Sequence, residues 1–247
     1  MKRTEKYSKP TAKFLSAGYD DYIASRVLLN AGLLAQGAVL ASTAIEKHLK
    51  ALLAFGGNVS HGHLKTAHIN AARAFDPHLA NDLNEPFLRL LQRAYKTRYT
   101  DTLEVGFNLV IAYREFLAEL DYTVHRLYTP LTFSQGELKL KQDYHTHRDE
   151  KDVRLMQNNY ILNGDNKEQF VEDQPQLVYE IRRCKVRGLL EAQYVTSPSK
   201  SDGNFLRSGY TPLDEEGKQY KFAFIPLPNE HAVSVNTFRA SYKPDGN

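Results

Sequence analysis

The sequence predicts an α+β protein, with an N-terminal up-and-down helical bundle over residues 1–128 and a small β-rich domain over residues 129–247. In residues 11–127 apolar side chains recur every three or four positions, which is the period of an amphipathic helix. After residue 128 the pattern changes to short alternating, β-branched and aromatic runs separated by turn residues, which is typical of strands. This change of period places the predicted domain boundary.

The composition is that of an ordinary globular protein. Of the 247 residues, 42% are hydrophobic and 25% are charged, which allows a packed core. No stretch approaches the roughly 18 consecutive apolar residues of a membrane span, and the basic start leads into no apolar signal core, so we expect a cytoplasmic protein. Cys184 is the single cysteine, which excludes an internal disulfide. The net charge of +3 is too small to indicate nucleic-acid binding by itself.

Two strong helices open the predicted bundle. The first is expected to end near the Asn-Ala-Gly of residues 30–32, and the second at the Gly-Gly-Asn of residues 56–58. Glu46 and Lys50 form an exposed i,i+4 pair on the second helix. The apolar stripes are Leu15, Tyr19, Ile23 and Val27 on the first helix, and Ala41, Ile45, Leu49, Leu52 and Leu53 on the second.

A weaker third helix is predicted over about residues 63–75. It breaks at Asp76-Pro77, because proline is disfavoured inside a helix and restricts the residue before it. A fourth helix begins near Pro86, which is favourable in a first turn, and ends at about Arg98.

The last and longest helix of the predicted bundle begins at Asp101. Asp101 is a candidate N-cap, and Glu104 follows three residues later. Helices with one apolar stripe bury it by packing on each other, which favours a bundle. The stripe of this last helix is Val105, Leu109, Phe116, Leu117, Leu120 and Val124.

Turn residues separate the strands that are predicted in the β-rich half. A hairpin is expected from residues 131–133 and 138–140, and a second turn at Asn163-Gly164-Asp165 between strands over residues 159–162 and 169–171. Further strands are expected over residues 177–186, 189–195, 220–225 and 232–238, with a loop over residues 197–204.

Three segments carry a family resemblance. Ala17–Arg26, Ala41–Leu53 and Tyr95–Asp101 together resemble the HEPN domain, the higher eukaryote and prokaryote nucleotide-binding domain. The resemblance implies a helical bundle that pairs as a homodimer. HEPN proteins include RNA-cleaving toxins, partners of nucleotidyltransferases, and members that only bind or scaffold. The implied partners are therefore a second copy of the chain, a nucleotide or RNA, and a nucleotidyltransferase or an antitoxin, with no membrane.

The ribonucleases of this family carry an arginine and a histidine separated by four to six residues near the start of the last helix, and they need no metal. Arg98 resembles that arginine in placement, but the histidine positions hold Leu103, Glu104 and Val105. The resemblance therefore implies a non-catalytic HEPN-like protein that binds nucleotide, RNA or a protein partner as a homodimer. The alternative is a metal-independent endoribonuclease of a toxin or defence system, rebuilt from Arg98 with His48 or His125.

The literal spacing of that motif occurs elsewhere, at Arg73 and His78. An imidazole can exchange a proton near neutral pH and a guanidinium can stabilise a phosphorane, so this pair is a weaker catalytic candidate. Because the pair falls at the break before the fourth helix, the two residues can equally be ordinary surface residues.

The residues around Arg98 are the ligand-binding candidates. Family dimers commonly form a basic groove between the last helices, which Arg93, Lys96 and Arg98 would supply here. The phenol rings of Tyr95 and Tyr99 add surfaces on which bases can stack.

A structural role for Arg98 remains the alternative. Helical spacing from Ala94 places Arg98 at the end of the core-facing stripe, where an ion pair with Glu46 or Asp20 would fix the helix junction.

The other polar clusters in the sequence are weaker indications of a functional site. The histidines at 61, 63 and 68, and those at 145 and 147, lack the spacing of a closed zinc site, so we expect no metal and no cofactor. In a strand, Arg183, Lys185 and Arg187 would share one face, which is either a phosphate-binding strip or a solvated surface. A third function remains open, in which the protein is a scaffold whose β-rich domain binds a protein or peptide at a sheet edge.

Overall fold

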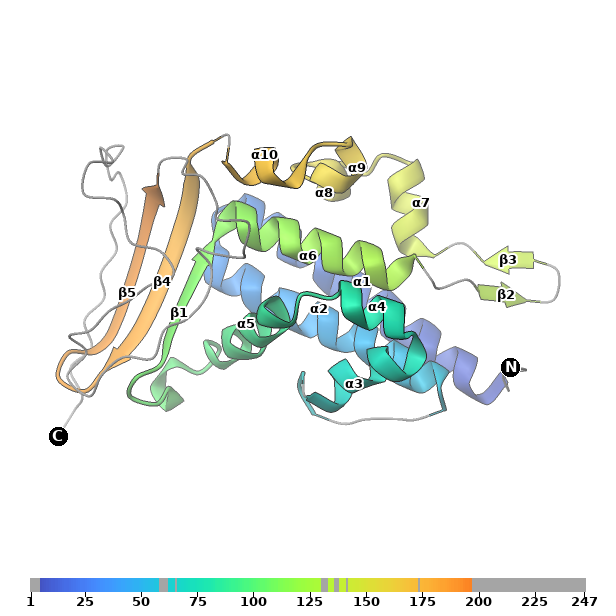
Figure 1. The fold of residues 1–247 in the computed structure, drawn as a ribbon, viewed down its shortest axis with the longest axis horizontal. Coiled ribbons are helices and arrows are strands. Elements are labelled where there is room, and N and C mark those ends of the chain that lie inside the picture. The colour runs from blue at the N-terminus through green and yellow to red at the C-terminus, as the bar shows by residue number, and fades with distance from the viewer. Residues whose placement is uncertain are drawn as a thin grey trace.

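The computed structural model describes residues 5–57, 62–64, 66–129, 133–135, 138–140, 142–172 and 174–196. Within them the protein is mostly helical, with a small three-stranded antiparallel sheet, which confirms the α+β class. Figure 1 shows an elongated molecule whose sheet closes one end of the helical body. None of the helices in this described part is long and apolar enough to cross a membrane.

The first two helices form an antiparallel pair, α1 (Glu5–Asn30) and α2 (Leu34–Phe55). They approach so closely at Gly37 that a Cβ there would lie 2.7 Å from Leu29 Cγ. The predicted stripes are largely buried, but Val27 is 44% exposed and Arg26 beside it is fully buried. The prediction for Val27 was wrong because Arg26, not Val27, faces a buried carboxylate, as described below.

Three further helices come next, and a capping residue precedes each of the last two. They are α3 (Thr66–Phe75), α4 (Pro77–Asp82) and α5 (Glu85–Lys96). Asp76 caps α4 by accepting a hydrogen bond from the backbone N of His78, and Asn84 caps α5 in the same way for Phe87. The predicted break and both predicted helices are therefore confirmed, with ends shifted by a few residues.

The predicted start of the last helix at Asp101 was wrong. Residues Thr100–Thr102 form a short 3₁₀ helix, β1 (Asn108–Ala112) follows, and α6 (Tyr113–Tyr128) begins only there. Strand β1 is completely buried and pairs with a strand some 70 residues later in the sequence. The capping pattern at Asp101 is local, and burial of an apolar strand outweighs it.

The sheet has the order β1-β4-β5, with β4 (Gln176–Cys184) and β5 (Gly188–Thr196), and all neighbours are antiparallel. These two strands confirm the predictions for residues 177–186 and 189–195, except that β4 ends at Cys184. Leu109, Ile111, Tyr179 and Ile181 share the face that joins the main core. Strand β1 comes from the first 128 residues and β4 and β5 from the later part, so the sheet draws on both sides of the predicted boundary.

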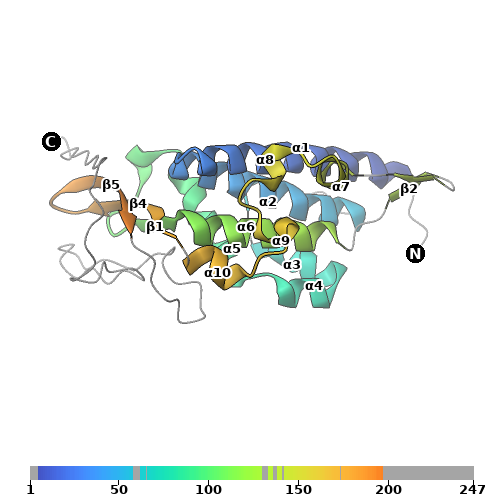
Figure 2. The same ribbon diagram turned by 90° about the horizontal axis from the view of Figure 1, so that it is seen from above.

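The predicted turn at Asn163-Gly164-Asp165 joins helices rather than strands. The short helices α7 (Asp143–Asp149), α8 (Val153–Met156), α9 (Tyr160–Asn163) and α10 (Lys167–Glu172) cover α6 and α1, as Figure 2 shows. The prediction of strands here was wrong because Asn159 caps α9 by accepting a hydrogen bond from Leu162 N.

A hairpin is present where one was predicted, as β2 (Phe133–Gln135) and β3 (Leu138–Leu140), but β2 begins at the last residue of the predicted first strand. The predicted loop at residues 197–204 and strands at residues 220–225 and 232–238 lie outside the described residues.

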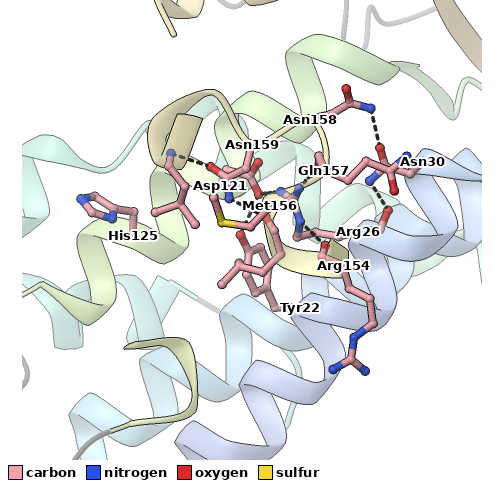
Figure 3. A network of polar contacts seen from close by, with 12 residues as sticks. Tyr22, Arg26, Asn30, Asp121, His125, Arg154, Met156, Gln157, Asn158 and Asn159 are labelled. Carbon is pink, nitrogen blue, oxygen red and sulfur yellow. Dashed lines mark hydrogen bonds and ion pairs between the residues drawn. The ribbon is translucent and has the colours of Figure 1, made fainter. Parts of the chain in front are cut away.

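A buried polar network ties the covering helices to the bundle (Figure 3). Arg26 and Asp121 form an ion pair in which both side chains are 0% exposed. Tyr22 donates a hydrogen bond of 2.8 Å to Asp121 Oδ1, and Arg26 donates to the carbonyl oxygens of Arg154 and Gln157. Arg26 thus fixes the α8 turn on α1, and a buried charge of this kind depends on its partners.

Candidate functional site

A cleft of about 530 Å³ opens where the end of α5 meets the loop that leads into β1. It contains most of the residues that the sequence singled out for ligand binding. The cleft is lined by Arg93, Tyr95, Lys96, Tyr99, Thr102, Leu103, Glu104, Val105, Gly106 and Phe107.

A tight turn and a β-bulge shape the far wall of this cleft. Phe107 N donates to Glu104 O at 2.9 Å, and Gly106 between them has φ = 90°, a conformation that favours glycine. Gly106 N donates to Arg183 O and Arg183 N donates to Phe107 O, both at 2.8 Å, so two residues here oppose one on β4. This is the geometry of a G1 bulge, a feature that re-aims side chains and is over-represented beside active sites.

Arg98 lies beside the cleft on two phenol rings. Its guanidinium carbon is 5.4 Å from the centre of the Tyr95 ring and 5.5 Å from that of Tyr99, and Arg98 Nη1 donates to the Tyr95 hydroxyl at 3.1 Å. Such stacking holds a cation in place while leaving other guanidinium donors available to a ligand.

The expected inward position of Arg98 was wrong. Its side chain is exposed and pairs with neither Glu46 nor Asp20, and within the described part of the chain it has no carboxylate partner. Helix α5 ends at Lys96, and the next turn is held by i→i+3 bonds such as Arg98 N to Tyr95 O at 3.3 Å. This tighter turn rotates Arg98 away from the core-facing stripe.

Both cationic and anionic side chains line the cleft, and the cationic side chains are in excess. Arg93 packs its guanidinium 4.7 Å from the centre of the Phe107 ring and donates to Asn108 O at 3.2 Å, while Lys96 is exposed. Glu104 is the carboxylate of the lining. Anionic ligands are therefore favoured near α5, and Glu104 restricts where their charge can lie.

A hydrogen-bonded chain extends from Arg98 to a histidine that sequence reasoning did not select for chemistry. The Tyr95 hydroxyl lies 2.9 Å from His63 Nε2, and the two rings pack in a tilted arrangement with centres 4.0 Å apart. His63 Nδ1 in turn lies 3.5 Å from Oε2 of Glu46, whose Oε1 accepts a hydrogen bond of 2.6 Å from Lys50. His63 is thus hydrogen-bonded to a phenol and lies within ion-pair distance of a carboxylate, with Arg98 at the end of the same chain.

The two histidines predicted as partners of Arg98 lie elsewhere. His48 is buried against Tyr128, with ring centres 5.0 Å apart, and its burial lowers its pKa to about 4. His125 contacts Tyr144 (Nδ1 to hydroxyl oxygen 3.0 Å), and its pKa is lowered by burial and then by nearby positive charge. Neither side chain lines the cleft or contacts Arg98, so the structure does not bring either histidine together with Arg98.

Arg73 and His78 are not brought together either. Arg73 contacts Asn70 Oδ1 at 3.1 Å and Glu85 Oε2 at 3.7 Å, while His78 lies in the first turn of α4 beyond the break. Both side chains are exposed, and nothing orients them toward each other. The arrangement matches the alternative of ordinary surface residues.

No group of three or more potential metal ligands occurs among the described residues. His147 instead contacts the Tyr19 hydroxyl, with its Nδ1 at 2.8 Å.

The predicted shared face of Arg183, Lys185 and Arg187 was wrong, because β4 ends at Cys184 and the next three residues form the turn into β5. Arg182, before them, is held by Glu180 at 2.8 Å. Arg183 is the residue that opposes Gly106 and Phe107 in the bulge. The basic run thus reaches the cleft wall through strand pairing, which no local pattern indicates.

Comparison of the chain with protein-family models, with curated proteins and with solved structures found no match.

Proposed function

We propose that the chain is a non-catalytic, HEPN-like protein that binds a nucleotide or single-stranded RNA at the cleft beside α5, and that it does so as a homodimer. The observation that carries this proposal is the combination of two phenol rings, of which that of Tyr99 is exposed, with guanidinium groups in and beside one cleft. Tyr99 is 55% exposed and Arg98 rests on its ring, so a base and a phosphate can be bound at neighbouring positions.

The positions of the three resembling segments support the HEPN-like part of the proposal. The first lies on α1, the second on α2, and the third at the end of α5. Helices α1 and α2 pack along each other, and α5 packs on α2.

Fluorescence anisotropy with a labelled single-stranded RNA of mixed sequence tests the binding, with ATP and GTP as competitors. Tyr99→Ala removes a stacking surface and is expected to cost about 1–3 kcal/mol of binding free energy. Arg98→Ala weakens binding and lowers its salt dependence, while Arg73→Ala, which removes an exposed arginine from α3, leaves both unchanged. The proposal fails if neither RNA nor nucleotide binds the wild-type protein at low salt.

Light scattering after size exclusion tests the homodimer separately. The expected mass is twice the 28.2 kDa of one chain. A monomer at micromolar concentration would remove the dimer from the proposal without affecting the cleft.

The chain Glu46–His63–Tyr95–Arg98 favours a second candidate, a metal-independent endoribonuclease. In that reaction His63 Nε2, after a ligand hydroxyl has displaced the Tyr95 hydroxyl, would take the proton of a ribose 2′-hydroxyl. The 2′-oxygen would bond to phosphorus while the bond to the 5′-oxygen breaks, and the 5′-oxygen would take up a proton from solvent water. Glu46 would stabilise the imidazolium, and Arg98 the phosphorane.

Incubation of end-labelled RNA with excess chelator distinguishes the two candidates. Cleavage that is lost in both His63→Ala and Arg98→Ala but kept in Arg73→Ala would establish the ribonuclease. RNA that stays intact while it binds supports the non-catalytic protein.

A further inference from the structure

The β4–β5 turn presents a basic, exposed tip. Lys185, Val186 and Arg187 form the turn, and Gly188 closes it with φ = 67°. All three turn residues are exposed, and Val186 is 74% exposed. We call residues 185–187 the hairpin tip.

The bulge connects the hairpin tip to the candidate site. Arg183 makes two backbone hydrogen bonds of 2.8 Å to Gly106 and Phe107, which line the cleft, and the tip begins two residues after Arg183. Figure 1 shows the β4–β5 turn and the loop before β1 at the same end of the molecule. The tip therefore lies at the same end of the sheet as the wall of the cleft.

Charge along this surface favours a polyanion. Lys96, Lys185 and Arg187 are exposed, and within the described ranges none has a carboxylate partner. Arg98 adds a fourth cation, against Asp101 and Glu104 in the intervening loop. A strand with several phosphates can follow such a row of cations, whereas a mononucleotide carries its phosphates at a single position.

We infer that the ligand of this protein is a single-stranded RNA segment rather than a free nucleotide, and that it runs from the cleft to the hairpin tip, where Lys185 and Arg187 bind backbone phosphates. The inference rests on the proposed function, because it extends the same cleft. Stacking on Tyr99 fixes one end of the strand, and the cations of the tip contact phosphates without reading sequence.

The test measures anisotropy with oligouridylates of 2, 4, 8 and 12 nucleotides over a range of salt concentrations, for the wild-type protein and two double variants. Lys185→Ala/Arg187→Ala removes the cations of the tip. Lys9→Ala/Lys13→Ala removes two exposed cations from the start of α1, at the other end of the molecule, and serves as the matched control.

The wild-type affinity is expected to rise with length and then level off. The tip variant should weaken binding of the 12-mer and lower the slope of log K against log salt by about 1.4, since each phosphate contact on a single strand contributes about 0.7. Its dinucleotide binding should equal that of the wild type, and the control should change neither.

Equal 12-mer binding by the wild-type protein and the tip variant would overturn this inference and leave the proposed function intact. If the wild-type protein binds none of the oligonucleotides, both fail. If polyglutamate of equal charge binds the wild-type protein more tightly than the 12-mer does, the surface binds an acidic protein and the assignment to RNA is wrong.

Discussion

His48 provides a stability prediction that is independent of any ligand. The imidazole is buried between α1, α2 and α6, with Nδ1 donating to Ala44 O at 2.7 Å. A Cβ on Gly18 would come within 2.9 Å of the ring, and Nε2 has no hydrogen-bond partner among the described residues. A proton on Nε2 would therefore place an unpaired charge in the core.

The sign of the pH dependence follows from this burial. Burial lowers the pKa of His48 to about 4 in the folded state, from 6.5 when exposed. Between these values the unfolded chain binds a proton that the folded protein does not, so stability falls as the pH falls from about 6.5 to 4. At about 1.4 kcal/mol per pH unit, His48 removes roughly 2 kcal/mol of stability by pH 5 and roughly 3 kcal/mol by pH 4.

Urea unfolding followed by circular dichroism, from pH 7.5 to pH 4.5, measures this contribution. His48→Gln cannot titrate, so its free energy of unfolding should fall less steeply with decreasing pH than that of the wild-type protein. Ile45→Val, a buried change one turn away, should lower stability by about 0.5–1.5 kcal/mol at every pH and keep the wild-type slope. Identical slopes for His48→Gln and the wild-type protein would refute the reasoning.

Three further substitutions test other parts of the fold by urea unfolding. Asp121→Ala leaves Arg26 as an unpaired buried charge and should cost about 3–5 kcal/mol of stability. The double variant Arg26→Met/Asp121→Leu should recover part of this loss. A loss below about 1 kcal/mol in Asp121→Ala would mean that the ion pair is not buried in solution. Gly106→Ala forces a side chain into φ = 90°, so it should lower the free energy of unfolding by about 1–2 kcal/mol and also weaken RNA binding. Gly164→Ala, at φ = 76° in an exposed turn, is its control and should lower stability without changing RNA binding. Asn84→Ala removes the cap that accepts from Phe87 N and should cost about 0.5–2 kcal/mol; an unchanged midpoint would contradict the cap.

Local patterns predicted those elements whose stability is local. The helices α1, α2, α3 and α5 could be located because their stripes, caps and breakers lie within one segment of the chain, whereas the short helix α4 was not predicted. Strand β1 could not be located, because its stability comes from pairing with β4 and from burial on both faces. The one-turn helices α8 and α9 are too short to show a period, so the Asn-Gly turn between α9 and α10 was taken for a hairpin.

The candidate site likewise contains residues that could be grouped from the sequence and residues that could not. Arg93, Tyr95, Lys96 and Tyr99 could be grouped from sequence because they share one helix end, and the structure places them on one cleft. His63 was predicted at the start of the third helix but precedes α3, and its contact with Tyr95 joins residues 32 positions apart. Arg183 reaches the cleft wall only through the bulge opposite Gly106. Contacts of this kind depend on tertiary packing, for which no local pattern exists.

The central claim is that RNA binds at the α5 cleft, and photocrosslinking tests it most directly. The protein is irradiated with a single-stranded RNA that carries 5-iodouridine at every other position, and the crosslinked residues are identified by mass spectrometry. The account predicts crosslinks at Tyr95 or Tyr99, with their yield lost in Arg98→Ala and kept in Arg73→Ala. Crosslinks confined to other surfaces, such as the α7 to α10 layer, would contradict it.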